Sequence, residues 1–433
     1  MNHVLKRAAA AAALMLLPFS LAFAQPLTLP DGYLSTRGNQ IVDNQGTPVR
    51  IAAVGWNGAD GGSYAPQGLD KINYRTTMRQ MMDAGFNTVR IAFSDRMLTE
   101  DPQRNAIDYR RNPELLGLSA LEVLDRIIDY AGEIGLKVIL DHHNNEGGSR
   151  PYRLGGQQRN GLWFDRGPGS TNDDNGDGTG NPGTVTAAMF RANWVILAQR
   201  YAGKPAVIGF DLHNEPTSGP KDNGINWGKG GPTDLHAMCT TVGAAIQAVN
   251  PGPLVICEGF QDYAAGFPDG DLRGVAEMPV VLPVPNKVVY SVHEFPREIA
   301  DVSPDSGPGA IARMNRSWGH LVINNVAPVF IGEMGSSMLT KESRAWASTL
   351  ISYMSGTAAD GPRFGDDEQP VSGCWWAWGD LPGQVPQGVL QHGWNPTTNG
   401  YHAEQRAVWS KILFMPRPSG SKPAAPKEKL SSR

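Results

Sequence analysis

The sequence predicts an α/β protein folded as a closed (β/α)8 barrel, also called a TIM barrel. Its 433 residues, 40% of them hydrophobic, can bury a large core. Short apolar runs alternate with amphipathic stretches, which is typical of parallel strands that are buried on both faces and joined by helices. Eight such runs occur, and several end in polar residues, where barrel active sites lie. An open doubly wound sheet is the alternative, disfavoured because no G-x-G-x-x-G turn follows the first strand.

The strands are expected at the apolar runs that follow the amino-terminal region. Each run is short enough for a barrel strand and is separated from the next by a longer segment. The eight expected strands are residues 49–57, 88–94, 137–143, 207–216, 254–260, 288–295, 327–335 and 371–380.

The clearest helix is expected at residues 119–135, where apolar residues recur at i, i+3, i+4 spacing. Ser119 is placed to cap it, and Glu122 completes a capping box three residues later. Further helices are expected at residues 186–203, 233–250, 313–326, 341–356 and 402–414.

Two segments outside these units are expected to serve the barrel. Residues 32–49 read as a β-hairpin, with turn signals at Asn39 and Asn44, and we expect it to plug the barrel floor. Residues 144–182 follow the third strand and are rich in Gly, Asp, Asn and Arg. A long loop in that place is expected on the catalytic face.

The two ends of the chain read as segments outside the fold. Lys6 and Arg7 precede an apolar run and an A-x-A cleavage site, which predicts a signal peptide over residues 1–24 and export to the periplasm or the medium. Residues 416–433 are rich in Pro, Ser and Lys and predict a disordered tail. A single catalytic domain is therefore expected over residues 26–415.

Composition disfavours several classes of partner. The net charge is −4 with no long Lys/Arg run, so we expect no nucleic acid and no anionic membrane as partner. No segment after the signal resembles a transmembrane span. The three cysteines, Cys239, Cys257 and Cys374, show neither zinc-site nor disulfide-scaffold spacing and are expected as buried free thiols.

Two expected strands end in a glutamate, Glu215 after the fourth and Glu333 on the seventh. A lone glutamate at a strand end is more commonly a salt-bridge partner, but a facing pair is the machinery of glycoside hydrolysis. Strands four and seven face each other across a barrel mouth. Pro216 favours an extended backbone at Glu215. Strict alternation points Asn214 away from Glu215, so a β-bulge is expected if both enter the site.

The sequence resembles glycoside hydrolase family 5, the retaining (β/α)8 cellulases, and most closely its bacterial endo-β-1,4-glucanase branch. The motifs that carry the resemblance extend over most of the chain: GYLSTRGNQIVDNQGTPVRI, FDLHNEP, EGFQDY, VPNKVVYSVHE, WGHLVINNVAPVFIGEMG and WWAW. It implies an exported cellulase that cuts β-1,4-glucan or a related oligosaccharide with retention and without cofactor or metal. We expect it to act as a monomer.

The resemblance also implies roles for individual residues. Glu215 would be the general acid/base, with Asn214 beside it on the sugar, and Glu333 would be the nucleophile. Arg90 would lie beside Glu333 and hold it ionised at neutral pH.

Four aromatic or histidine positions are further candidates for the site, three of them implied by the resemblance. His143 matches a family histidine, and His293 another on the sixth strand. Trp376 would form the floor under the sugar, followed by a peptide bond that is commonly cis in the family. Trp56, at the end of the first strand, is expected to be a stacking platform.

One departure from the family pattern concerns Phe295. The family usually has a tyrosine there, whose hydroxyl contacts the nucleophile. A phenylalanine cannot donate that hydrogen bond, so either another donor replaces it or catalysis is slower or tuned to another substrate.

Other functions stay open from the sequence. The same frame hydrolyses mannan, xyloglucan or short β-glucosides, because loops choose the sugar. A non-catalytic carbohydrate-binding barrel would keep the cleft alone. A metal-dependent hydrolase on Asp141, His142 and His143 is disfavoured, since neighbouring strand residues face opposite ways. Residues 173–184 match only the first half of a calcium loop.

Overall fold

The computed structural model describes residues 28–147, 156–166, 183–218, 223–300, 303–380, 385–391, 400 and 402–414. The predicted signal peptide, the tail from residue 416 and most of the calcium-like segment lie outside these residues. No helix within the described ranges is long and apolar enough to cross a membrane.

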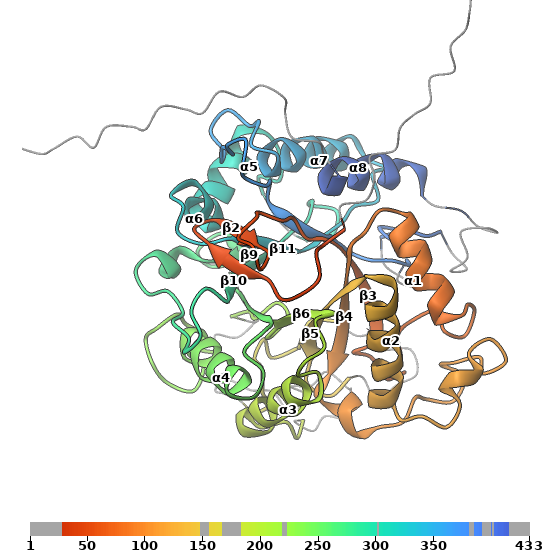
Figure 1. Cartoon of the computed structure of the whole chain (residues 1–433). Coiled ribbons are helices and arrows are strands. Elements are labelled where there is room, and N and C mark those ends of the chain that lie inside the picture. Colours follow the sequence, from red (N-terminus) through yellow and green to blue (C-terminus); the bar gives the residue numbers. More distant parts are fainter. Residues whose placement is uncertain are drawn as a thin grey trace, which may run out of the picture.

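Eight parallel strands close into a barrel in chain order, which confirms the predicted fold (Figure 1). Each strand pairs with the next, and β12 pairs with β3 to close the ring. The interior-facing and helix-facing side chains of most strands are both buried, as expected for a barrel wrapped in helices. The barrel strands are β3 (Ala52–Ala59), β4 (Thr88–Ser94), β5 (Lys137–Asn144), β6 (Val207–Asp211), β7 (Leu254–Glu258), β10 (Val288–Glu294), β11 (Val329–Met334) and β12 (Ser372–Trp375).

The helices surround the barrel (Figure 1). The predicted capping box is present, with the Ser119 hydroxyl and the Glu122 carboxylate each bonded to the other's backbone N–H. Residues 313–326, predicted as one helix, are divided by a π-turn at Asn315–Gly319. The helices are α1 (Tyr74–Asp83), α2 (Ala120–Ile134), α3 (Ala187–Arg200), α4 (Leu235–Val249), α5 (Gly307–Met314), α6 (His320–Ile323), α7 (Lys341–Met354) and α8 (Ala403–Phe414).

The predicted hairpin, β1 (Ser35–Arg37) and β2 (Gln40–Val42), closes the floor of the barrel. The Lys287 ammonium, just before β10, donates to the Leu34 carbonyl at 2.6 Å. Leu34 packs with barrel residues such as Ile139 in one apolar cluster. Because the floor is filled, the polar strand ends at the opposite rim are left as the mouth. A second small sheet, β8 (Phe260–Asp262) and β9 (Phe267–Asp271), follows β7.

Candidate active site

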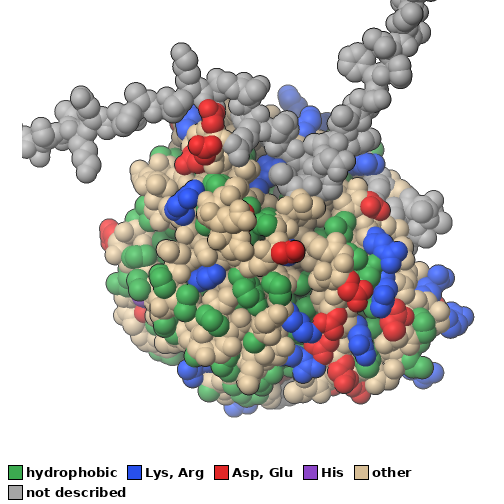
Figure 2. All heavy atoms as spheres, in the orientation of Figure 1, with side chains coloured by type: hydrophobic (Ala, Val, Ile, Leu, Met, Phe, Trp, Pro, Cys, Tyr) green, Lys and Arg blue, Asp and Glu red, His purple; other side chains and the backbone are tan. Residues whose placement is uncertain are grey.

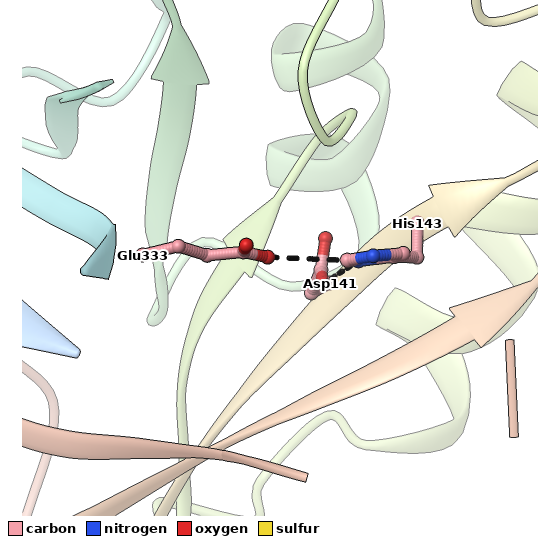
Figure 3. A group of neighbouring side chains, drawn as sticks. All are labelled: Asp141, His143 and Glu333. Atoms are coloured by element: carbon pink, nitrogen blue, oxygen red, sulfur yellow. Dashed lines mark hydrogen bonds and ion pairs between the residues drawn. The ribbon is translucent and has the colours of Figure 1, made fainter. Parts of the chain in front are cut away.

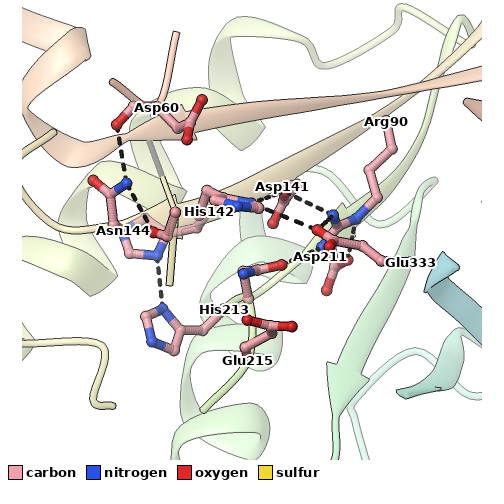
Figure 4. Close-up of polar contacts among 12 residues, drawn as sticks. Asp60, Arg90, Asp141, His142, Asn144, Asp211, His213, Glu215 and Glu333 are labelled. Atoms are coloured by element: carbon pink, nitrogen blue, oxygen red, sulfur yellow. Dashed lines mark hydrogen bonds and ion pairs between the residues drawn. The ribbon is translucent and has the colours of Figure 1, made fainter. Parts of the chain in front are cut away.

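Arg90, on β4, is the centre of the polar cluster at the barrel mouth (Figure 4). Its Nη1 lies 2.7 Å from Glu333 Oε1 and 3.0 Å from Asp141 Oδ2. Its Nε donates to Asp211 at 2.9 Å, and its Nη2 to the Asn214 amide oxygen at 3.0 Å. Arg90 is fully buried, so these partners replace the water that its charge has lost. One guanidinium thus fixes side chains from three other strand ends.

Glu333 reaches the cluster because β11 is irregular. Val292 pairs with Ile331, but His293 pairs with Glu333, which leaves Gly332 as an extra residue on β11. A Cβ on Gly332 would lie 2.5 Å from the Ser291 hydroxyl. The glycine therefore lets β11 bulge against β10 and brings Glu333 beside His293.

Glu215 adopts a backbone that differs from the one predicted. Its φ is +47°, in the left-handed region, so the extended conformation expected before Pro216 is wrong. The predicted bulge is not at this point either, because β6 ends at Asp211 and its extra residue against β5 is Ile208. Beyond the ladder, the left-handed turn lets Asn214 bond to Arg90 while Glu215 turns toward His293. Such a backbone costs on the order of 1–3 kcal/mol.

The two glutamates lie close together across the mouth. One carboxylate oxygen of Glu215 and one of Glu333 are within 4.8 Å of each other. His293 lies between them, with Nδ1 at 2.9 Å from Glu215 Oε1 and 3.7 Å from Glu333 Oε2. A gap of this size suits direct attack by one carboxylate, since retaining glycosidases hold the pair about 5 to 5.5 Å apart.

The pKa values of the two carboxyls are shifted in opposite directions. Burial raises the pKa of Glu333, and the charges of His293 and Arg90 offset only part of this rise. Burial also acts to raise the pKa of Glu215. The hydrogen bond and the charge of His293 oppose burial, and the net pKa lies below its usual range. Arg90 acts in the expected direction, because its charge lowers the pKa of Glu333, but burial raises that pKa by more. The protons belong to the buried cluster as a whole rather than to single residues.

His143 and Trp376 stack against each other in the site. Their rings stack at 5.1 Å with an angle of 8°. Burial disfavours the charged imidazole, but Asp141, 2.6 Å from Nδ1, raises the pKa of His143 to about 10. The peptide bond from Trp376 to Ala377 is cis, as expected. Phe295 packs in the same apolar cluster as Trp376.

Trp56 does not have the position that was expected. It is fully buried, and its indole N–H donates to the Gln67 carbonyl at 2.9 Å. Alternation along β3 is the reason, because Gly55 faces Trp376 inside the barrel and the next side chain points outward. Both faces of Trp56 are therefore covered, and it cannot stack on a sugar.

His142 faces away from His143, as alternation predicts. Its Nε2 bonds to Asp95 at 2.7 Å, and its Nδ1 to His213 Nδ1 at 2.9 Å. Both rings lie among aromatic side chains of the helical layer, including Phe190. His142 and His213 thus support the wall behind Asn214 and Glu215 instead of meeting His143 at a shared site.

Two triads in the described residues bring possible metal-ligand atoms within 4.8 Å: Asp141, His143 and Glu333 (Figure 3), and Glu215, His293 and Glu333. Both include Glu333, which the Arg90 guanidinium already contacts. That positive charge competes with any cation, so we assign these side chains no metal.

Asp141 and Asp211 are central residues that the sequence analysis did not place in the site. Both contact Arg90 and are fully buried. A signal was available: Asp141 stands two residues before His143, on the same face of its strand. A Cβ on Gly209 would point at Ile139 inside the barrel, and Asp211, two residues later, lies on the same inner face of β6.

Comparison with known proteins agrees with this architecture. The family described as Cellulase (glycosyl hydrolase family 5) matches residues 42–381. An endoglucanase of Paenibacillus polymyxa is 29% identical, over 83% of this chain and 88% of its own. The major extracellular endoglucanase of Xanthomonas campestris is 27% identical, over 90% of this chain and 75% of its own. A hyperthermophilic endocellulase from Pyrococcus horikoshii superposes with a TM-score of 0.71 at 25% identity, covering 88% of this chain and 99% of that one. The chain therefore belongs to glycosyl hydrolase family 5, the cellulase family.

Proposed function

We propose that this protein is a retaining endo-β-1,4-glucanase that cuts β-1,4-glucan by double displacement. The observation that carries the proposal is the pair of carboxylates from opposite sides of the barrel, Glu215 and Glu333, with oxygens within 4.8 Å. Membership in a retaining family and endoglucanase relatives support the same reaction.

In this mechanism Glu333 attacks the anomeric carbon while Glu215 gives a proton to the departing glycosidic oxygen. The bond from C1 to the leaving oxygen breaks as the ester between C1 and Glu333 forms. Glu215, now a carboxylate, then removes a proton from water, which attacks C1 and releases Glu333. During the first step the negative charge passes from Glu333 to Glu215, and the neighbouring His293 and Arg90 balance it.

The remaining site residues are proposed to hold the sugar. The indole of Trp376, with His143 stacked against it, offers a flat floor for a pyranose ring. Asn214, fixed by Arg90, is proposed to contact the sugar bound at the cleavage point. We also propose that the protein is exported and acts as a monomer; one relative is named as an extracellular enzyme.

The function is tested by reducing-sugar release from carboxymethylcellulose, mannan, xylan and xyloglucan in parallel. We expect the fastest release from carboxymethylcellulose, with a rapid fall in viscosity because cuts fall inside the chain. Preference for another glycan would move the assignment to a different glycosidase of the same mechanism. Binding without release from any of the four would favour the carbohydrate-binding barrel.

Gly55 is expected to control the position of the Trp376 indole. A Cβ at this position would lie 2.3 Å from Trp376 Cε3, so Gly55→Ala has to displace the ring. A misplaced group in a site of this kind can cost on the order of 100-fold in rate. We expect kcat/KM on carboxymethylcellulose to fall by at least about tenfold.

The matched control for Gly55→Ala is Gly132→Ala on α2, where a Cβ meets another side chain only at 3.6 Å. Far-ultraviolet circular dichroism should be unchanged in both variants. Wild-type kcat/KM in Gly55→Ala would show that the Trp376 ring is free to shift without loss.

A further inference from the structure

The loop that follows β11 and the nucleophile lies against the backbone of Trp376. The Trp376 N–H donates to the Met334 carbonyl at 2.8 Å. A Cβ on Gly335 would lie 2.5 Å from the Trp376 carbonyl oxygen, so the two backbones approach closely. A shift of this loop therefore has to move Trp376 as well.

The loop that follows β10 also packs around Trp376. Phe295 and Trp376 belong to one apolar cluster, and Ile299 and Ala300 pack against that cluster. The N–H groups of Ile299 and Ala300 both donate to the Pro296 carbonyl, at 2.9 and 3.1 Å, which makes this loop a compact turn. The tryptophan that forms the floor of the sugar site is thus packed by two different loops.

Glu298 joins these two loops. Its Oε1 accepts the Ser336 hydroxyl and the Ser337 backbone N–H, both at 2.8 Å, and its Oε2 accepts the Ser337 hydroxyl at 2.9 Å. Both serines are buried, and Glu298 is half-buried. Hydrogen bonds to a carboxylate are stronger than those between neutral groups. We refer to Glu298, Ser336 and Ser337 as the loop latch.

The two serine hydroxyls extend the loop latch to the backbone of the β11 loop. The Ser336 oxygen accepts the Met338 N–H at 3.0 Å, and the Ser337 oxygen accepts the Leu339 N–H at 3.1 Å. Met338 has a φ of +59°, in the left-handed region, which is unusual for a side chain of this kind. By fixing both hydroxyls, Glu298 also stabilises this turn.

We propose that Glu298 is a positioning residue that holds Trp376, the floor under the sugar, in place beside the nucleophile Glu333. The loop latch joins the β10 loop to the β11 loop, and Trp376 contacts the residues on both sides of that joint. The latch thereby sets the distance between the sugar floor and the carboxylate that attacks the sugar. Because Glu298 acts on the sugar site, this role rests on the proposed function.

Two substitutions at Glu298 test the role. Glu298→Ala removes the acceptor of three hydrogen bonds and frees the loops from each other. A misplaced group in such a site can cost on the order of 100-fold in rate, so kcat/KM on carboxymethylcellulose should fall by at least about tenfold. Glu298→Gln keeps an oxygen for Ser336 and Ser337 and should stay within about threefold of wild type. Glu277→Ala, at an exposed position after β9, is the matched control and should keep wild-type kcat/KM.

Rates per working site separate positioning from stability. The dinitrophenyl glycoside of 2-deoxy-2-fluorocellobiose leaves a long-lived glycosyl-enzyme, so the dinitrophenol released at completion counts the competent sites. A latch that served stability alone would lower the melting temperature but leave kcat/KM per site unchanged well below it. Wild-type kcat/KM per site in Glu298→Ala would therefore overturn the proposal, and so would a Gln variant as damaged as the Ala variant.

A double-mutant cycle tests whether Glu298 acts through the serines. Ser336→Ala with Ser337→Ala is compared with Glu298→Ala and with all three changes together. The loss of kcat/KM in the triple variant should be smaller than the product of the two separate losses, because both changes break the same contact. A full product would show that Glu298 acts by another route and would contradict the latch.

Failure of this inference is distinct from failure of the proposed function. A wild-type protein that releases sugar from none of the four glycans would refute the proposed function. A wild type and a Glu298→Ala variant that cut the same glycan equally well, per competent site, would refute the role of Glu298 and leave the proposed function intact.

Discussion

Glu333→Gln is expected to lower kcat on carboxymethylcellulose by at least about 10⁴-fold, because removal of a nucleophile leaves only binding and electrostatic effects. The amide has nearly the same shape as the carboxylate and can still meet Arg90, so the fold should be kept. Initial rates of reducing-sugar release, with the melting temperature as a check on folding, measure the effect. Glu342→Gln, at an exposed position in the first turn of α7, is the matched control and should retain wild-type kcat.

The two glutamates are distinguished by their smaller variants and by the product formed with azide. In Glu333→Gly, azide can occupy the space of the lost carboxylate and displace the leaving group, which gives the α-glycosyl azide from a dinitrophenyl β-cellobioside. In Glu215→Ala the same substrate still forms the glycosyl-enzyme, because its leaving group needs no proton. Azide then attacks from the opposite face and gives the β-glycosyl azide. Exchanged products would reverse the two roles.

Glu215→Gln provides the complementary result on the polymer. Loss of the general acid should reduce kcat/KM by about 10²- to 10⁴-fold on carboxymethylcellulose. With the dinitrophenyl cellobioside, the rate of the first step, formation of the glycosyl-enzyme, should fall much less, because its leaving group needs no proton. Equal losses on the two substrates would show that Glu215 does more than transfer a proton.

Phe295→Tyr is expected to increase kcat by about 10- to 100-fold, the reverse of the loss seen when a preorganised donor is removed. Phe295 packs edge-on against His293 at a ring distance of 6.3 Å and shares a cluster with Trp376. The family usually carries a tyrosine there whose hydroxyl contacts the nucleophile. In this chain Glu333 Oε2 has His293 Nδ1 at 3.7 Å, which is beyond hydrogen-bond length.

The pH profile of Phe295→Tyr should move with the rate. Burial raises the pKa of Glu333, so part of the enzyme holds a protonated nucleophile on the acidic side. A tyrosine O–H donated to the carboxylate favours the ionised form and lowers that pKa. The acid limb of kcat should therefore shift to lower pH.

Phe364→Tyr is the matched control, since Phe364 lines a cavity next to the floor hairpin, together with Gln40 of β2. It should change neither kcat nor the acid limb. If Phe295→Tyr also leaves both unchanged in a folded protein, then another donor already serves Glu333. In that case the phenylalanine is neutral for catalysis on carboxymethylcellulose.

Much of the fold could be predicted because its signals are local. A buried parallel strand has to be apolar along its length, and a helix that covers it has to be amphipathic, so the eight strands and most of their helices could be predicted from the sequence. The capping box of α2 depends on residues three apart and was predicted correctly. The helix α1 was missed, and the π-turn at Asn315–Gly319 was not foreseen, because tertiary packing overrides weak local preference there.

The sequence by itself determined which residues could do chemistry, and the tertiary structure decided how they meet. Strand parity separated His143 from His142. The same alternation along β3 directs Trp56 to the outer face of the barrel, where it is fully buried. The left-handed backbone of Glu215 could not be predicted, because its N–H partner, Glu258, is 43 residues away in the chain.

The same limit applies to Arg90. Its bonds to Asp141, Asp211 and Glu333 span up to 243 residues and exist only after the barrel closes. Burial, which sets the pKa values of the whole cluster, likewise arises only from that closure. The chemistry of each side chain is therefore encoded locally, whereas the charge it carries depends on neighbours that only the closed barrel brings together.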